Sequence, residues 1–281
     1  MQPLTVIRVF LFSNARRVGI IIGNILFRIL KPVTQFKFNN STKLFKYRVL
    51  KRDIYLRKIP SDMSRMNEIH IGVNRIGKYT KTFPLTKSPN VLIDLGANIG
   101  SASLAIYNDF PHLELVIGIE ADRNNFNVLK KNFRLFEENS IHKSQFLPIY
   151  GYFNSDSKPG FFQGSINGSE YGSKQFAKSQ KESIESVPGF GPEEISNLIK
   201  ENDLFILKVD VEGGENEIFS KNLSWLDRCA IIIIEIHDRY EPANLLRSSN
   251  SFIKYLATEN YAIIPIDDSL ICINSKFQEP K

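Results

Sequence analysis

A glycine-containing turn between an apolar strand and a helix constrains this 281-residue chain more than any other feature. Residues 91–93 are Val, Leu and Ile, which favour a buried strand, and residues 101–107 (SASLAIY) read as the opening of a helix. The connecting residues 94–101 are DLGANIGS. Gly96 and Gly100 can adopt left-handed backbone angles and let a ligand approach the main chain. A strand, a glycine turn and a helix in this order predict an α/β domain.

An acidic residue follows at the end of the next predicted strand. Residues 115–119 (LVIGI) form a second apolar run, and Glu120 comes directly after it. An acid at this position of a nucleotide-binding α/β domain accepts hydrogen bonds from ribose hydroxyls. The free N–H groups at the start of the helix after the glycine turn can hold a carboxylate or another anion. Together these features predict a site for an adenosine-containing ligand.

The spacing of the glycines separates two classes of such ligand. A pyrophosphate needs the middle glycine of a Gly-x-Gly-x-x-Gly motif, but Asn98 stands at that position. The resulting Gly-x-x-x-Gly spacing suits a ligand with an amino-acid tail. It therefore favours S-adenosylmethionine over a nicotinamide or flavin dinucleotide, while a tight turn that binds nothing is the structural alternative.

Composition and charge narrow the class of protein. With 42% hydrophobic residues the chain can bury a full core, so one α/β domain with an N-terminal extension is the simplest interpretation. Cys229 and Cys272 lie inside apolar runs, which favours reduced core cysteines and a reducing compartment such as the cytoplasm. The net charge of +6 is common among soluble enzymes, and without a compact basic cluster or a known reading motif we expect no nucleic-acid partner.

The N-terminal part differs in composition from the rest of the chain. Residues 1–50 are aromatic, apolar and basic, and their longest apolar stretch, residues 18–27, is shorter than the about 20 residues of a membrane-spanning helix. A helix packed on the domain or on a partner subunit is one interpretation, and a basic amphipathic helix on an anionic membrane is the other. We expect peripheral membrane contact through residues 1–35 at most. Residues 44–87 read as short strands and turns, so the extension 1–87 is predicted to be helical and then β-rich.

From residue 88 onward, predicted strands alternate with predicted helices. The strands are expected at 91–95, 115–119, 145–150, 204–209 and 231–236, and the helices at 101–109, 123–138, 215–223 and 247–259. The continuous apolar run 231–236 indicates burial on both faces, as in a parallel sheet. Segments 261–266 and 270–273 are joined by a short polar link that can only form a hairpin. The domain 88–281 is therefore predicted to be a mostly parallel sheet that ends in an antiparallel hairpin, as Rossmann-like methyltransferases do.

One segment interrupts this alternation. Residues 154–202 are rich in serine and glycine and include a basic and polar run. Such a composition hardly builds a core, so the segment is either a disordered insertion or a loop that orders over the substrate. We expect a substrate-side loop at this place.

Polar residues follow several of the predicted strands, where ligands of open α/β sheets lie. They are Asp94, Glu120, Asp210, Glu212, Glu235 and His237. A hydroxyl that accepts a methyl group must lose its proton, which requires a His, Asp or Glu within hydrogen-bonding reach. His237 is the first candidate for this base and Asp210 the second, with Glu212 on the same side of the extended chain as Asp210. A capping role for His237 stays open, as does a divalent Mg²⁺ or Mn²⁺ ion held by Asp210, Glu212 and His237.

Four longer segments occur in the order and spacing of a known family. They are VLIDLGANIGS at 91–101, VIGIEADRNNFNVLKKN at 116–132, FILKVDVEGGENEIF at 205–219 and IIIEIH at 232–237. With these segments the chain resembles the FkbM family of S-adenosylmethionine-dependent methyltransferases over most of residues 90–275. The chain departs from the family pattern between residues 182 and 202, where PGFGPEEI replaces the customary threonine, leucine and aspartate stretch.

This resemblance implies a Rossmann-like class I methyltransferase fold with S-adenosyl-L-methionine as cofactor. It implies that Asp94, Gly96, Asn98 and Gly100 surround the methionine part of the cofactor and that Glu120 holds its ribose. The predicted cofactor-binding set is completed by Ala97, Ser101, Ala121 and Asp210.

The resemblance also implies a reaction, because family members of known function are mostly O-methyltransferases acting on sugar hydroxyls or natural-product scaffolds. We expect an O-methyltransferase for a sugar hydroxyl of a glycan, glycolipid or sugar nucleotide. An N-methyltransferase and a natural-product O-methyltransferase are the alternatives within the same class. A non-catalytic adenosyl-binding scaffold protein is the alternative of another class.

Overall fold

The computed structural model describes most of the chain from residue 44 onward. The described residues are 44–49, 52–57, 59, 61–62, 82–140, 142–162, 185–211, 214–237, 249–266 and 269–279. They belong to one compact unit, residues 42–281. The predicted N-terminal helix within residues 1–35, Glu212 and the middle of the predicted loop 154–202 lie outside them.

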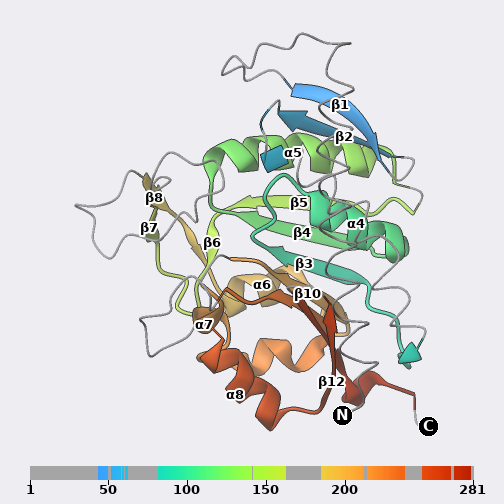
Figure 1. Cartoon of the computed structure of the whole chain (residues 1–281), viewed down its shortest axis with the longest axis vertical. Helices are drawn as coiled ribbons and strands as arrows, with labels where there is room; N and C mark the ends of the chain where they lie inside the picture. The colour runs from blue at the N-terminus through green and yellow to red at the C-terminus, as the bar shows by residue number, and fades with distance from the viewer. Residues whose placement is uncertain are drawn as a thin grey trace, which may run out of the picture. The chain divides into compact units, whose positions relative to one another are not determined.

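A seven-stranded sheet forms the centre of this unit (Figure 1), in the order β12-β13-β11-β10-β3-β4-β5. The strands are β3 (Val91–Leu95), β4 (Leu115–Glu120), β5 (Gln145–Tyr150), β10 (Phe205–Val209), β11 (Cys229–Glu235), β12 (Tyr261–Ile266) and β13 (Ser269–Asn274). From β11 to β5 all neighbours are parallel, whereas β13 runs antiparallel to both β11 and β12. The predicted parallel sheet with an antiparallel hairpin at its end is confirmed.

Helices connect the parallel strands. They are α4 (Ser101–Asp109), α5 (Arg123–Glu138), α6 (Pro192–Leu198), α7 (Glu215–Ile218) and α8 (Asn250–Thr258), with 3-10 turns η3 (Leu223–Arg228) and η5 (Ser275–Phe277). The predicted helices 101–109 and 123–138 are confirmed to the residue. The second of them begins sharply because the Asp122 carboxylate accepts a hydrogen bond from the Asn125 N–H at 2.8 Å. The helix predicted at 215–223 is shorter, since α7 ends at Ile218 and a 3-10 turn follows.

The sheet is buried on both faces. Neighbouring residues of β3, Leu92 and Ile93, are each 0% exposed but belong to different core clusters. The cluster of Leu92 contains Phe133 of α5, and the cluster of Ile93 contains Phe252 of α8, so these helices cover opposite faces. Burial on both faces explains why the strand sequences are continuously apolar, as predicted.

The two cysteines lie in this core. Cys229 and Cys272 are free and buried, as predicted. Burial raises the pKa of the Cys272 thiol to about 12, and it raises the pKa of the Cys229 thiol as well. Both side chains therefore behave as small apolar groups.

The β-rich character of the extension is visible in a hairpin of β1 (Leu44–Val49) and β2 (Arg52–Arg57). Ile54 and Leu56 of β2 are 0% exposed and join the core cluster that contains α5. The hairpin thus packs onto α5 (Figure 1). The predicted domain boundary between residues 87 and 88 stays a prediction. No helix among the described residues is long and apolar enough to cross a membrane.

The predicted loop 154–202 is more structured at its ends than its composition suggests. Short strands pair there, β6 (Tyr152–Phe153) with β9 (Gly189–Phe190) and β7 (Gly160–Phe162) with β8 (Glu185–Val187), and α6 follows. Val187 and Ile195 are 0% exposed, so this part contributes to the core. Helix α6 starts because a proline occupies its first turn and the Glu194 carboxylate accepts a hydrogen bond from the Gly191 N–H at 2.9 Å.

Candidate functional site

The glycine turn after β3 has the left-handed backbone that its sequence predicts. The φ angles are +78° at Gly96, +52° at Asn98 and +87° at Gly100. A Cβ atom at Gly96 would overlap the backbone carbonyl oxygen of Asp210, so this position admits only glycine. The turn is therefore pressed against the end of β10, and Gly100 leads directly into α4.

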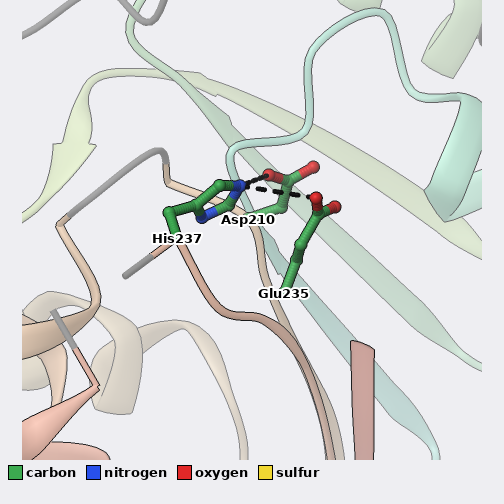
Figure 2. A group of neighbouring side chains, drawn as sticks. All are labelled: Asp210, Glu235 and His237. Carbon is green, nitrogen blue, oxygen red and sulfur yellow. Dashed lines mark ion pairs between the residues drawn. The ribbon is translucent and has the colours of Figure 1, made fainter. Parts of the chain in front are cut away.

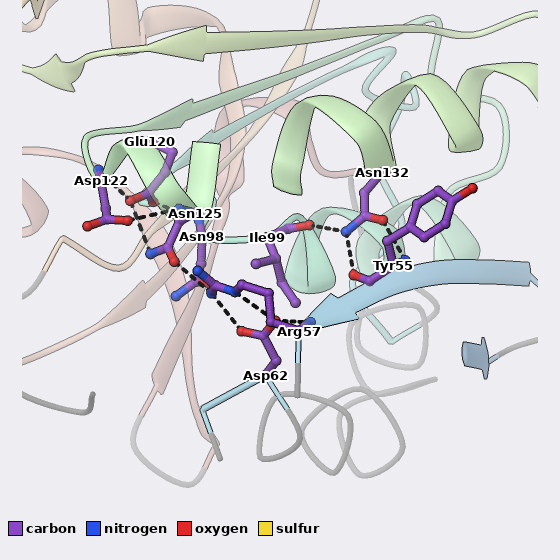
Figure 3. Close-up of polar contacts among 9 residues, drawn as sticks. All are labelled: Tyr55, Arg57, Asp62, Asn98, Ile99, Glu120, Asp122, Asn125 and Asn132. Atoms are coloured by element: carbon purple, nitrogen blue, oxygen red, sulfur yellow. Dashed lines mark hydrogen bonds and ion pairs between the residues drawn. The ribbon is translucent and has the colours of Figure 1, made fainter. Parts of the chain in front are cut away.

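Glu120 ties this turn to the end of β4 (Figure 3). Its carboxylate is 8% exposed and accepts hydrogen bonds from the Asn98 N–H and the Asp122 N–H, each at 2.8 Å. The Asn125 side-chain amide donates to the same carboxylate at 3.4 Å. The acid therefore lies where the two turns of the predicted nucleoside site meet. Its contact with a ribose stays a prediction.

The other predicted cofactor-binding residues lie around the same turns. Ala97 and Ser101 are buried, at 2% and 5% exposure, and Ala121 is half-buried. The Gly96 and Ala97 N–H groups both donate to the Ile119 carbonyl at 3.0 Å, which fixes the turn on the end of β4. The structure thus brings these residues together at the C-terminal ends of β3 and β4.

Asp94 points into the protein interior and pairs with a lysine that the sequence analysis missed. Its carboxylate is 0% exposed, accepts a hydrogen bond from the Ser103 hydroxyl at 2.6 Å and lies 3.1 Å from the Lys208 ammonium. Lys208 also donates to the Gly96 carbonyl at 3.1 Å and lies 3.5 Å from Asp210. The signal was present, because a single lysine within the apolar strand FILKV must find carboxylate partners when it is buried.

A buried histidine lies at the ends of β10 and β11 (Figure 2). His237 is 3% exposed, and its Nε2 atom lies 3.7 Å from Asp210 Oδ1 and 3.5 Å from Glu235 Oε1. Its Nδ1 atom lies 2.5 Å from Glu215 Oε1, on a carboxylate that is 0% exposed. The hydrogen bond to Glu215 orients the imidazole ring, so that Nε2 faces the other two carboxylates.

The structure thus brings His237 and Asp210 together, whereas Glu212 lies outside the described residues. Glu235 ends an apolar strand and was recognisable as a strand-end acid, but its pairing with His237 was not predicted. Glu215 was missed altogether. It begins a four-residue helix, and no sequence spacing connects it with a histidine 22 residues away.

Among the described residues of this group, carboxylates outnumber basic side chains. Asp94, Asp210, Glu215 and Glu235 face Lys208 and His237 through the contacts given above. An excess of negative charge in a largely buried group favours a cationic ligand. The donor atoms of Asp210, Glu235 and His237 lie within 4.8 Å of one another, so these three residues are also able to hold a metal ion.

Comparisons with known proteins identify the family of the chain. A family model described as the methyltransferase FkbM domain matches residues 94–261, and no curated protein matches the chain. Among solved structures, the chain is similar to the methyltransferase FkbM from Methylobacillus flagellatus KT, with 14% identity and a TM-score of 0.43, over 66% of this chain and 43% of that one. The chain thus spans less than half of that relative.

Two further structures are similar at the same level. A methyltransferase from Geobacter sulfurreducens has 16% identity and a TM-score of 0.38 over 78% of this chain and 91% of that one. The SAH-bound methyltransferase PaMTH1 from Podospora anserina has 11% identity and a TM-score of 0.39 over 77% and 80%. The family model alone covers more than half of the 281 residues, and the chain therefore belongs to the FkbM family of methyltransferases.

Proposed function

We propose that this S-adenosylmethionine-dependent methyltransferase transfers the methyl group to a hydroxyl oxygen, on a sugar of a glycan, glycolipid or sugar nucleotide. The observation that carries an oxygen acceptor is the buried His237, which Glu215 holds at Nδ1. A hydroxyl has to lose its proton as the new bond forms, and an oriented imidazole beside the sheet edge meets this need.

The residues present fit the cofactor that the family implies. The backbone at Gly96 leaves no space for a side chain, and the turn from Gly96 to Gly100 opens at the N-terminal end of α4, which favours a carboxylate. This turn would hold the methionine part, and Glu120 would hold the ribose. The acidic group around His237 suits a positively charged sulfonium. When bound, the cofactor supplies the methyl group and keeps the electron pair of the broken carbon–sulfur bond.

In the proposed reaction, the protein orients the acceptor and removes its proton. An acceptor held about 3 Å from the methyl carbon reacts by in-line displacement. His237 takes the hydroxyl proton at Nε2, and the Glu215 carboxylate stabilises the imidazolium that forms. Asp210 lies between this base and Lys208, which in turn contacts the glycine turn. It therefore helps to fix the position of His237 relative to the cofactor-binding turn.

A polar cavity lies near α7, and none of its lining residues belongs to the group around His237. It has a volume of about 660 Å³ and is lined by Ser155, Asp156, Ser157, Pro192, Glu193, Ser196, Asn222, Ser224 and Trp225. Hydroxyl, carboxylate and amide groups of this kind suit the hydroxyls of a saccharide. The cavity adjoins the helix that carries Glu215, because Ser155 donates a hydrogen bond to Glu217 of α7 at 3.4 Å.

A methyl-transfer assay tests the proposal. Purified protein is incubated with methyl-labelled cofactor and with sugar nucleotides, glycolipids, lipid-linked glycans or amines, and the labelled product is analysed. We expect label in a methyl ether of a sugar, which resists mild alkali. Transfer only to nitrogen, or cofactor binding without any turnover, would contradict an O-methyltransferase.

A pair of histidine variants tests the assigned base. We expect His237→Asn to lower kcat about 10²- to 10⁴-fold, the usual contribution of a general base, with little change in cofactor affinity. His112→Asn changes an exposed histidine and should leave kcat unchanged. Equal activity of both variants would remove His237 from the proposed mechanism.

A further inference from the structure

We propose that Asp210, Glu235 and His237 bind one divalent cation of the Mg²⁺ and Mn²⁺ class at the C-terminal ends of β10 and β11. Each residue offers one donor atom, and these atoms lie within 4.8 Å of one another (Figure 2). Two carboxylate oxygens and one imidazole nitrogen form a donor set that suits Mn²⁺ well and Mg²⁺ acceptably.

The separations between the donor atoms fit a shared ion better than direct hydrogen bonds. His237 Nε2 is 3.5 Å from Glu235 Oε1 and 3.7 Å from Asp210 Oδ1, which is at or beyond the limit of hydrogen bonding. Two ligands that lie about 2.1–2.4 Å from one cation, at an angle of roughly 95–125°, are separated by the same distances. A cation between His237 and each carboxylate thus fits these two separations, and the two carboxylate oxygens lie within 4.8 Å of each other.

The orientation of the imidazole is a second and independent indication. Glu215, outside the donor set and 0% exposed, holds Nδ1 at 2.5 Å. Metal-binding histidines commonly donate their other ring N–H to a carboxylate, which turns the remaining lone pair toward the ion. In this tautomer the Nε2 lone pair of His237 faces two carboxylate oxygens, and a cation among them converts repulsion into attraction.

The environment of Asp210 also fits. Lys208 approaches its Oδ2 atom at 3.5 Å, whereas Oδ1 faces His237. The lysine thus partly balances one side of the carboxylate and orients the other oxygen toward the proposed ion. His237 is 3% exposed, whereas the Asp210 side chain is 14% and the Glu235 side chain 29% exposed, so solvent reaches both carboxylates.

The consequence for catalysis rests on the proposed function. A hydroxyl that binds a divalent cation ionises more easily, because the cation stabilises the alkoxide. In the metal-loaded enzyme His237 would act as a ligand, and the hydroxyl proton would pass to solvent water. The cation would thus take over the task that the metal-free protein leaves to Nε2.

A titration with Mn²⁺ alone tests the site without cofactor or acceptor. The full chain is treated with a chelator, dialysed and titrated, and free Mn²⁺ is followed by electron paramagnetic resonance. We expect one saturable site per chain and at least tenfold weaker binding in Glu235→Gln. Glu215→Gln retains the three ligands and should weaken binding about 10- to 100-fold, as is usual for a residue that orients a ligand.

A matched control and a fold check accompany these variants. Glu114→Gln removes an exposed carboxylate, 62% exposed, outside the proposed site and should bind Mn²⁺ like the parent chain. Thermal unfolding shows whether each variant is folded, and Mn²⁺ should raise the Tm of the parent but not of folded Glu235→Gln.

Two results would overturn the proposal. One is the absence of saturable Mn²⁺ binding by the full chain, and the other is equal affinity of the parent and folded Glu235→Gln. Either result would show that these three side chains do not form a site for a divalent cation. Because the titration needs no acceptor, its failure leaves the O-methyltransferase proposal intact, whereas Mn²⁺ binding without transfer to a hydroxyl contradicts only that proposal.

Discussion

The two halves of the candidate site are built in different ways. On the cofactor side, the turns after β3 and β4 are held by backbone N–H groups that donate to Glu120 and by left-handed residues such as Gly96. On the acceptor side, side chains from β10, β11 and α7 meet through charges around His237. Backbone geometry makes the glycine turn of the first half intolerant of added volume. The second half depends on side-chain charges, and we expect it to respond to changes of charge.

Lys208 joins the two halves, so its loss should have the largest effect. Lys208→Met keeps the bulk of the side chain but leaves the carboxylates of Asp94 and Asp210 without their ammonium partner. We expect the free energy of unfolding to fall by about 3–5 kcal/mol, as for other broken buried ion pairs. Denaturant unfolding measures this change.

An exposed lysine provides the control for this variant. The Lys200 side chain is 81% exposed and pairs with Glu114 at 3.6 Å, so Lys200→Met should change the free energy of unfolding by less than about 0.5 kcal/mol. Similar losses in both variants would mean that Lys208 does not join the halves.

Gly96→Ala should disrupt the glycine turn of the cofactor side without any change of charge. The added methyl group meets the Asp210 carbonyl, and the φ angle of +78° is unfavourable for alanine. We expect a loss of about 2–4 kcal/mol in unfolding free energy together with a loss of S-adenosylhomocysteine affinity. Calorimetry and denaturant unfolding measure the two effects.

Gly214→Ala is the matched glycine variant. Gly214 has a φ angle of −84°, and its nearest neighbour would be a Val211 methyl group at 3.2 Å. It should retain both stability and cofactor affinity. A Gly96→Ala protein that binds S-adenosylhomocysteine as tightly as Gly214→Ala would show that the turn does not form the cofactor site.

Paired glutamate variants sharpen the comparison between the halves. Glu120→Gln removes a charged acceptor of two backbone N–H groups, and we expect S-adenosylhomocysteine affinity to fall about 10- to 100-fold, since such bonds contribute about 1.5–3 kcal/mol. Glu235→Gln should leave this affinity within about twofold in the absence of metal. Calorimetric titration with S-adenosylhomocysteine compares the two variants. Equal losses of affinity would mean that Glu120 and Glu235 contribute alike to the cofactor site.

The smallest expected effect on stability concerns the Ser157–Glu194 hydrogen bond, which lies outside both halves of the site. The Ser157 hydroxyl donates a hydrogen bond to the Glu194 carboxylate at 2.6 Å and holds the pKa of Glu194 below its ordinary value. A lowered folded-state pKa stabilises the fold above the ordinary pKa of glutamate, and this contribution is lost as the pH falls through the folded value. The stability advantage of the parent over Ser157→Ala should therefore be present at pH 7 and disappear on acidification. Denaturant unfolding of both proteins across this pH range measures the difference in stability. A difference that grows toward acidic pH would contradict this prediction.

The same difference between the halves explains how much could be predicted from the sequence. Strand β3, the glycine turn and α4 are contiguous, so the alternation of apolar run, glycine and helix predicts all of them. The order of β11, β10 and β3 in the sheet follows from connections that span many residues. A sequence without coordinates names the strand-end residues Asp210, Glu235 and His237, but it does not say that they converge.

Two features escaped prediction for physical reasons. Glu215 reaches His237 because the chain turns at Gly214 into a helix of four residues, which is too short for any periodic signal. Residues 185–199 were read as a loop because strands of two or three residues next to Gly and Pro show no hydrophobic alternation. The burial of Val187, Ile195 and Ile199 by tertiary contacts reveals that the segment belongs to the core.

The side-chain amide of Asn132 on α5 determines where the chain can be truncated without loss of support for the site. The Asn132 side chain is 0% exposed, accepts from the Tyr55 N–H at 2.6 Å, and donates to the Tyr55 carbonyl at 3.1 Å and to the Ile99 carbonyl at 2.8 Å (Figure 3). The Asn132 amide thus holds both the β1–β2 hairpin and the glycine turn on helix α5. A truncated chain that starts at residue 88, the boundary that the motifs alone suggest, lacks Tyr55. Asn132 then loses two of these three hydrogen bonds, and the glycine turn loses part of its support.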